Sequence, residues 1–224
     1  MIPYKDDNPT NKIPFVTIGI ILLNILIFLF EATSRSGMKE ITYAYGAIPH
    51  YIMTLDTEQP IHPMLTIFSS MFMHGGLFHL AGNMLYLWIF GNNIEDRLGH
   101  VRFILFYLFC GIASAYAHAI TEPDSLMPMI GASGAVSGIL GAYLILFPKA
   151  TVYTLLFLGF FVTTLKVPAL IVIGFWAIIQ FVNGLMSTGV NGRGGIAWFA
   201  HIGGFLIGLV TIKLWLPRRT KQWL

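Results

Sequence analysis

Charged residues are scarce in this sequence of 224 residues, where Asp, Glu, Lys and Arg together make up 10% of the chain. Hydrophobic residues make up 56%, so too little polar surface is present to coat a soluble globule. The composition therefore excludes an ordinary soluble domain and favours a polytopic membrane protein.

Cysteine is almost absent, since Cys110 is the only one. A lone cysteine excludes an internal disulfide. A thiol mechanism would pair Cys110 with His118, which lies about 12 Å away along the same predicted helix, too far for proton transfer. We therefore expect Cys110 to be a small core residue.

A strong excess of positive charge is also lacking, because the net charge is +3. The Lys and Arg residues lie at the ends of apolar segments and in the C-terminal tail rather than on one face. That distribution is typical of topology signals and not of a nucleic-acid-binding surface. We expect no nucleic-acid partner.

Six apolar runs are long enough to form membrane helices, since a span needs about 20 residues at 1.5 Å each. They cover about 13–30, 77–94, 102–120, 133–147, 168–186 and 197–216. The loops between them are too short to fold alone. The sequence therefore predicts an all-α, six-helix transmembrane bundle that forms a single domain over residues 1–224.

Two further segments are not predicted to span the membrane. Residues 31–73 mix proline and acidic residues with aromatics and methionine, and we expect them to lie partly in the membrane interface. Residues 151–163 are apolar but number only about 13, which favours an interfacial or re-entrant piece over a span.

The positive charges favour one topology. If residues 151–163 do not cross the bilayer and the N-terminus is cytoplasmic, most Lys and Arg residues fall inside and only Arg35, Lys39 and Arg193 fall outside. The positive-inside rule then predicts a multi-pass protein, of a cell membrane, with both termini in the cytoplasm.

This topology starts the second, fourth and sixth helices on the outer side, where His79, Ser133 and His201 lie near the starts. The fourth helix, about 22 Å long, is shorter than a hydrocarbon core of about 30 Å. With its inner end anchored by Lys149, Ser133 lies several Å below the outer surface, and His201 falls at a similar depth.

Ser133 and His201 can form a catalytic dyad at that depth. A serine hydroxyl needs a base to take its proton, and a neutral imidazole serves near pH 7. Each residue is followed by a pair of glycines four apart, Gly134 with Gly138 and Gly204 with Gly208, which let helix backbones approach closely. The start of a helix also gives Ser133 a free backbone N–H that suits an oxyanion.

His79 and Asn83 lie four residues apart, so both side chains can point into one cavity. His74 precedes them at the membrane edge. The spacing of His74 and His79, with no acidic residue between them, does not fit a two-histidine metal motif. We expect no metal and no cofactor, and an aspartyl mechanism is excluded because no Asp or Glu lies inside a predicted span.

Three motifs resemble those of the rhomboid family of intramembrane serine proteases. They are G-x-S-G at 131–134, A-H-x-x-G-x-x-x-G at 200–208 and H-x-x-x-x-H-x-x-x-N at 74–83. The resemblance covers most of the chain from Phe72 onward. It implies Ser133 as nucleophile, His201 as base, and the Ser133 N–H with His79 and Asn83 as the oxyanion site, supported by His74, Gly131 and Gly134.

The resemblance also implies that the fifth helix, with Phe175 and Trp176, is a lateral gate to lipid. Two features differ from some family members: Ser137 stands where an aromatic residue stacks on the histidine, and residues 31–73 lack a Trp-Arg pair.

The predicted function is cleavage of transmembrane segments of other membrane proteins, near the outer face. A catalytically silent rhomboid-like protein that binds membrane helices is the alternative. A channel or transporter is disfavoured, because paired charges and broken helices at mid-membrane are absent.

Overall fold

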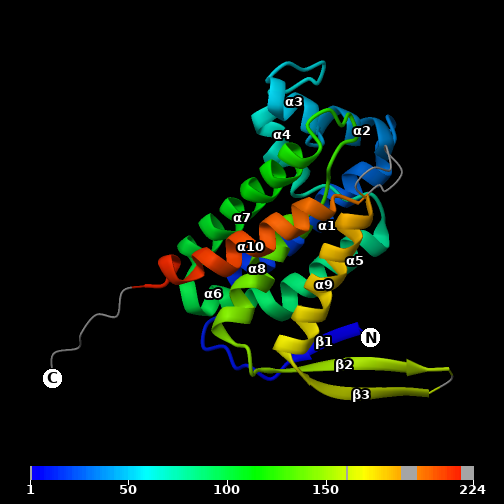
Figure 1. Ribbon diagram of the computed structural model, residues 1–224. Coiled ribbons are helices and arrows are strands. Elements are labelled where there is room, and N and C mark those ends of the chain that lie inside the picture. The colour runs from blue at the N-terminus through cyan, green and yellow to red at the C-terminus, as the bar shows by residue number, and fades with distance from the viewer. Residues whose placement is uncertain (1, 160, 188–195, 218–224) are drawn as a thin grey trace.

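The computed structural model describes residues 2–159, 161–187 and 196–217, which form a helical bundle with a small β-sheet at one end (Figure 1). Helices occupy all six predicted ranges. They are α1 (Phe15–Thr33), α5 (Leu77–Tyr86) continuing through a π-helical turn (Leu87–Gly91) into α6 (Asn92–Leu98), α7 (His100–Thr121), α8 (Ser133–Leu146), α9 (Ala169–Ser187) and α10 (Trp198–Trp215).

Four helices in the described part of the chain, α1, α7, α9 and α10, are long and apolar enough to cross a membrane. Helix α8 has 14 residues and is about 21 Å long, as the short fourth apolar run predicted. The length and hydropathy of these helices make the chain a multi-pass membrane protein. Two features remain predictions. They are the number of spans and the side of the membrane on which the two termini lie.

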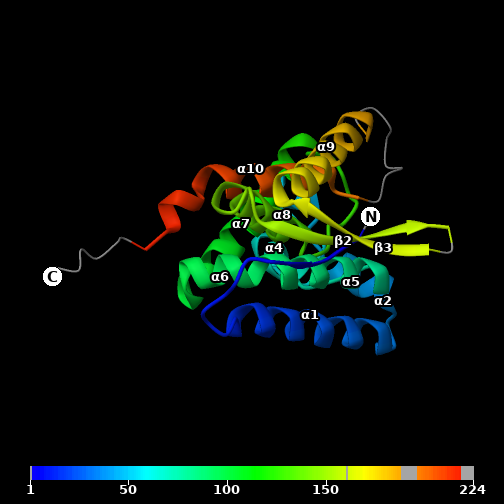
Figure 2. The same cartoon turned by 90° about the horizontal axis from the view of Figure 1, so that it is seen from below.

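Helix α8 lies at the centre of the bundle, with ten of its residues buried. It packs against α7 on one side and α10 on another, while α1 and α9 lie at opposite edges of the bundle (Figure 2). A Cβ on Gly204 would overlap the Gly134 carbonyl, and one on Gly208 would overlap the Gly138 carbonyl. The predicted close approach of the two glycine pairs is confirmed.

Residues 31–73 contain three short helices, α2 (Met38–Tyr45), α3 (Pro49–Thr54) and α4 (Pro63–Ser70), which gather at the end of the bundle where α8 begins (Figure 1). This segment holds the chain that leads into α8. Ala47 exchanges two backbone hydrogen bonds with Met129, at 3.1 and 2.7 Å, and the Gly131 N–H donates to the Ser70 carbonyl at 2.8 Å. Residues 31–73 therefore hold in place the segment that precedes Ser133.

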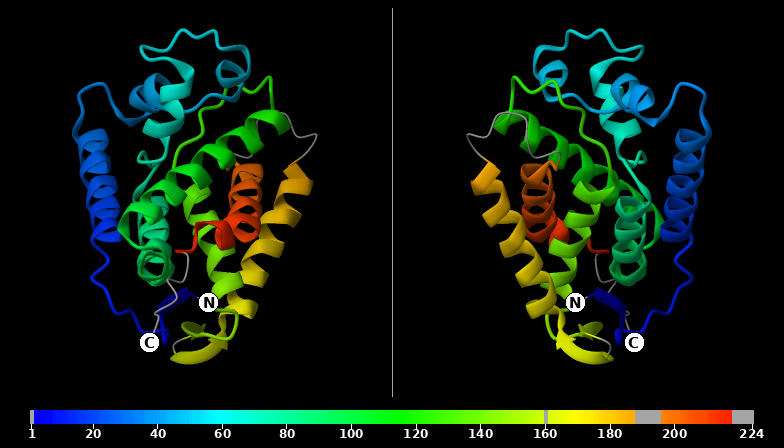
Figure 3. Two further views of the ribbon diagram at one scale, coloured as in Figure 1. Left: turned by 90° about the vertical axis from the view of Figure 1, so that its left-hand side faces the viewer. Right: turned by 90° about the vertical axis from the view of Figure 1, so that its right-hand side faces the viewer.

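A three-stranded antiparallel sheet, which was not predicted from the sequence, lies at the opposite end of the bundle from α2, α3 and α4 (Figure 3). Its strands are β1 (Ile2–Asp6), β2 (Thr151–Leu158) and β3 (Phe161–Pro168), in that order. The segment predicted as interfacial or re-entrant is therefore mostly a β-hairpin. Its Thr, Val and Phe residues favour strand, and Gly159, with φ +62°, supplies the left-handed turn residue.

Strand β1 is fixed to the bundle by Asp6. The Asp6 carboxylate accepts hydrogen bonds from the Tyr143 hydroxyl of α8 at 2.5 Å and from Asn93 Nδ2 of α6 at 2.9 Å. Burial raises the pKa of Asp6 above its usual range. The N-terminal strand thus holds the end of α8 that lies away from Ser133.

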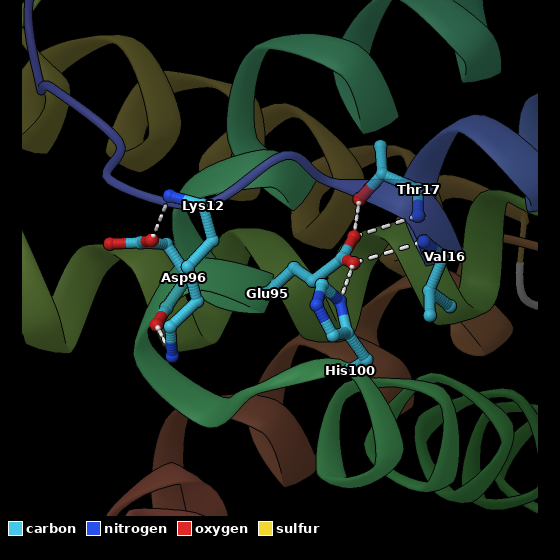
Figure 4. Close-up of polar contacts among 6 residues, drawn as sticks. All are labelled: Lys12, Val16, Thr17, Glu95, Asp96 and His100. Carbon is cyan, nitrogen blue, oxygen red and sulfur yellow. Dashed lines mark hydrogen bonds and ion pairs between the residues drawn. The ribbon is translucent and has the colours of Figure 1, made fainter.

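Glu95 joins three helices at the same end (Figure 4). Its carboxylate is buried and accepts the backbone N–H groups of Val16 and Thr17 at 2.9 and 2.7 Å, and the Thr17 hydroxyl at 2.6 Å. His100 Nδ1 lies 2.6 Å from the same carboxylate. A carboxylate placed there satisfies free N–H groups at the start of α1 and complements the helix dipole.

Candidate active site

Ser133 and His201 meet between α8 and α10. Ser133 is the first residue of α8, and His201 lies one turn into α10. The distance from Ser133 Oγ to His201 Nε2 is 2.8 Å, within hydrogen-bonding range. The structure therefore brings together the two residues for which the sequence predicted a nucleophile and a base.

Gly131 leaves room for His79 beside Ser133. Its φ of +124° favours glycine, and a Cβ there would lie 2.8 Å from two ring atoms of His79 and 3.4 Å from Ser133 Oγ. Gly134 has a different steric role, because a Cβ there would overlap the Ser114 side chain of α7. Both glycines of the G-x-S-G motif are thus required by close packing at the site.

Asn83 lies one turn after His79 on α5, and both line the cavity that contains Ser133 and His201. The cavity has a volume of about 1540 Å³. Asn83 is 7% exposed, and its Nδ2 has no hydrogen-bond partner among the described residues. A buried amide donor without a partner is available to an oxyanion that forms in the cavity.

His74 lies behind His79 rather than in the cavity. The two rings meet edge to face, with centroids 5.1 Å apart, and the His74 backbone N–H donates to Glu31 Oε2 at 3.2 Å. Helix α1 continues past the predicted end at Phe30, so Glu31 is a buried part of its last turn. Position alone therefore suits His74 to support the His79 ring.

Gln180 of α9 is a site residue that was not predicted from the sequence. It is buried, and its Oε1 lies 2.8 Å from His201 Nδ1, on the side of the ring away from Ser133. Gln180 Nε2 donates to the Trp176 carbonyl at 3.2 Å. The available signal was a polar residue inside an otherwise apolar stretch of a membrane helix, which is costly and often functional.

Residue 137 is a serine, so no aromatic ring at this position stacks on the His201 imidazole. The Ser137 hydroxyl instead donates to the Ser133 carbonyl at 2.6 Å, within α8. Two tryptophans flank the imidazole instead: the ring centroid of Trp176 lies 6.3 Å from that of His201, and the centroid of Trp198 lies 6.1 Å from it. The histidine is thus enclosed by α9 and by the first turn of α10.

Two neighbouring features of α9 and α7 complete the surroundings. Trp176 lines the cavity, whereas Phe175 beside it is 56% exposed and points away. Cys110 is fully buried against Gly138, which confirms its predicted core position.

Among the described residues, no cluster of three or more His, Cys, Asp or Glu side chains could hold a metal ion.

Residues 62–218 match the family model of the Rhomboid domain. The rhomboid protease GluP of Bacillus subtilis (strain 168) is 33% identical over 141 residues, which cover 63% of this chain and 25% of that protein. Rhomboid protein 1, mitochondrial, of Saccharomyces cerevisiae is 30% identical over 212 residues, which cover 92% of this chain and 54% of that protein.

Presenilin-associated rhomboid-like protein, mitochondrial, of Homo sapiens is 30% identical over 148 residues, which cover 65% of this chain and 36% of that protein. The chain therefore spans between about a quarter and about a half of the length of these relatives. The similarity covers all the residues of the candidate site, which lie between His74 and His201.

Proposed function

Since the chain belongs to the rhomboid family, we propose that it is an intramembrane serine endopeptidase with Ser133 as nucleophile and His201 as general base. The observation that carries this proposal is the 2.8 Å contact between Ser133 Oγ and His201 Nε2. A serine with a base in hydrogen-bonding range is the arrangement that covalent acyl transfer requires.

In the proposed reaction, Ser133 Oγ attacks the carbonyl carbon of the scissile peptide bond while His201 Nε2 takes the hydroxyl proton. The tetrahedral intermediate collapses when the imidazolium gives that proton to the leaving amine. The acyl-enzyme is then hydrolysed by a water molecule, which gives a proton to His201, and the imidazolium returns that proton to Ser133 Oγ as the acyl–oxygen bond breaks. Each half of the reaction returns the histidine to its neutral form.

The negative charge of the intermediate is held by the backbone N–H of Ser133 and by the side chains of His79 and Asn83. This assignment is supported by the free Asn83 Nδ2 and by the contact of the His79 ring with Gly131. Donors fixed in place before the reaction stabilise the developing oxyanion without reorganisation. His74 supports the His79 ring from behind.

The proposed substrates are transmembrane segments of other membrane proteins, which enter from lipid beside α9. Attack requires an exposed peptide bond, whereas a membrane helix hides its backbone in hydrogen bonds that are costly to break in lipid. We therefore expect cleavage near the membrane face closest to Ser133. Gly or Pro just inside the cleavage point favours unwinding, and family resemblance implies a small residue before the scissile bond.

Residues 1–224 act as one rhomboid-like domain in this proposal, with six spans and both termini on the cytoplasmic side of a cell membrane. The N-terminal strand and the end of α10 lie away from the end of α8 that carries Ser133, which supports a common side for the two termini. The distribution of Lys and Arg residues supports the cytoplasmic side.

Reaction with a fluorophosphonate tests the proposal, because this reagent labels only an activated serine. The purified wild-type protein is expected to be labelled, and Ser133→Ala and His201→Ala are expected to lose the label. A wild-type protein that folds but stays unlabelled would favour the catalytically silent alternative.

A further inference from the structure

A continuous chain of hydrogen bonds leads from α9 to Ser133. The Trp176 carbonyl accepts from Gln180 Nε2 at 3.2 Å, Gln180 Oε1 meets His201 Nδ1 at 2.8 Å, and His201 Nε2 meets Ser133 Oγ at 2.8 Å. Gln180 is buried, and its contact with His201 is partly buried.

The first link fixes the direction of the chain. A backbone carbonyl can only accept, so the amide nitrogen of Gln180 must face Trp176. The amide oxygen of Gln180 then faces His201, and because that oxygen can only accept, Nδ1 must carry the proton. Nε2 is left with its lone pair free for the Ser133 hydroxyl. This is the tautomer that a general base requires.

We propose that Gln180 is a positioning residue that sets the tautomer and orientation of His201. This inference rests on the proposed function of the Ser133–His201 pair and adds a third member to it. Gln180 does not touch the reacting atoms; it acts through the imidazole. It takes over the orienting role that a stacked aromatic ring could have had at position 137, where this chain has serine.

The position of Gln180 on α9 links the state of the base to the position of this helix. Trp176, which accepts from Gln180 and flanks the imidazole, lies on the same helix. Displacement of α9 would withdraw both residues from His201 together. Acylation therefore requires α9 to be docked against α10, so a substrate that displaces α9 on entry is attacked only after the helix returns.

The first test compares Gln180→Leu with Gln180→Glu. Leu removes the acceptor and is expected to lower kcat by about tenfold to a hundredfold while KM changes little, as for the loss of one orienting hydrogen bond. A protonated Glu keeps both links, since its hydroxyl can donate to the Trp176 carbonyl and its other oxygen can accept from Nδ1. We expect Gln180→Glu to keep kcat within about threefold of wild type.

Ile173→Ala is the matched control, because Ile173 is a buried residue of α9 that packs in the bundle core. It removes core packing from α9 but leaves the acceptor in place and the helix docked against α10. We expect it to lower thermal stability and to leave kcat within about threefold of wild type. An equal loss of kcat in Ile173→Ala and Gln180→Leu would assign Gln180 to packing.

The second test is independent of activity. Nitrogen-15 NMR of histidine-labelled wild-type protein, with the His201 signals assigned by their loss in His201→Ala, is expected to show Nδ1 protonated and Nε2 unprotonated. Gln180→Leu is expected to shift His201 toward the other tautomer. Wild-type His201 protonated on Nε2 would overturn this inference, even if Ser133 proved catalytic. Absence of Ser133-dependent activity alongside the expected tautomer would instead contradict the proposed function.

Discussion

Gly208 of α10 lies against the backbone carbonyl of Gly138 of α8, so closely that a Cβ added to Gly208 would overlap that carbonyl. Gly204 and Gly134 meet in the same way one turn earlier, and this close approach of the two helices brings His201, at the start of α10, to Ser133, at the start of α8. Because the obstacle is backbone and not a flexible side chain, it cannot move without separating the two helices.

Gly208→Ala is therefore expected to lower stability by about 1–3 kcal/mol, as overpacking of a tight core does, and to reduce kcat by displacing His201 from Ser133. Thermal unfolding in detergent and a cleavage assay measure the two effects. Gly174→Ala on α9 is the control, since a Cβ there would meet no atom within 4 Å. Equal stability and activity of the two variants would show that the α8–α10 contact does not position the site.

Asn83→Ala and His79→Ala are each expected to lower kcat by about tenfold to a thousandfold without abolishing cleavage. Each removes one oxyanion donor among several, and loss of a single donor has effects of this size in other hydrolases. The readout is kcat under saturating substrate, with folding checked by thermal unfolding. Unchanged kcat in both variants would reassign the two residues to packing around the cavity.

The contributions of Asp6 and Asp7 to the free energy of unfolding are expected to depend on pH in opposite directions. Burial raises the pKa of Asp6, so its contribution is greatest below the pKa of the unfolded chain and declines as pH rises through the folded value. Hydrogen bonds from Thr151 lower the pKa of Asp7, so its contribution is present above the unfolded pKa and is lost as pH falls through the folded value.

Thermal unfolding of Asp6→Asn and Asp7→Asn between pH 3 and 8 checks this pair of signs. Relative to that of wild type, the thermal stability of Asp6→Asn is expected to increase as pH rises. The relative stability of Asp7→Asn is expected to decrease as pH rises. The same trend in both variants would contradict the different environments of the two carboxylates at the end of β1.

A disulfide between α9 and α10 tests lateral entry of the substrate. A Cβ at Gly184 would lie 3.6 Å from Trp198 Cβ, within the range of about 3.5–4.5 Å that a disulfide needs. In a Cys110→Ala background, oxidised Gly184→Cys/Trp198→Cys is expected to react with a fluorophosphonate but to lose cleavage of a transmembrane substrate. Reduction should restore that cleavage. Equal cleavage in the oxidised and reduced forms would show that α9 need not separate from α10.

The sequence predicted the helical bundle and the meeting of Ser133 with His201, because hydropathy sets the helix ranges and paired glycines mark a close helix contact. It did not predict the sheet. Residues 151–163 are apolar on both strand faces near the turn, so they show no clear alternation, and strand β1 pairs with residues about 150 positions away. Such distant pairing leaves no local pattern in the sequence.

Gln180 escaped prediction for a related reason. Its polarity within an apolar helix was visible, but its partner depends on how α9 is rotated against α10, which hydropathy does not determine. Glu31 was placed just beyond a predicted span, and helix α1 extends past that point by less than one turn. The helices could be predicted from the sequence, whereas the side-chain contacts between them could be found only from the structure.

Cleavage by purified protein in liposomes tests the central claim most directly, with a single-pass substrate that carries Gly or Pro near the expected site. Wild-type protein is expected to cut this substrate near the membrane face closest to Ser133, and Ser133→Ala, shown to be folded by its thermal unfolding, is expected to cut none. Cleavage by Ser133→Ala at close to the wild-type rate, in a preparation free of other proteases, would contradict the assignment of Ser133 as the nucleophile.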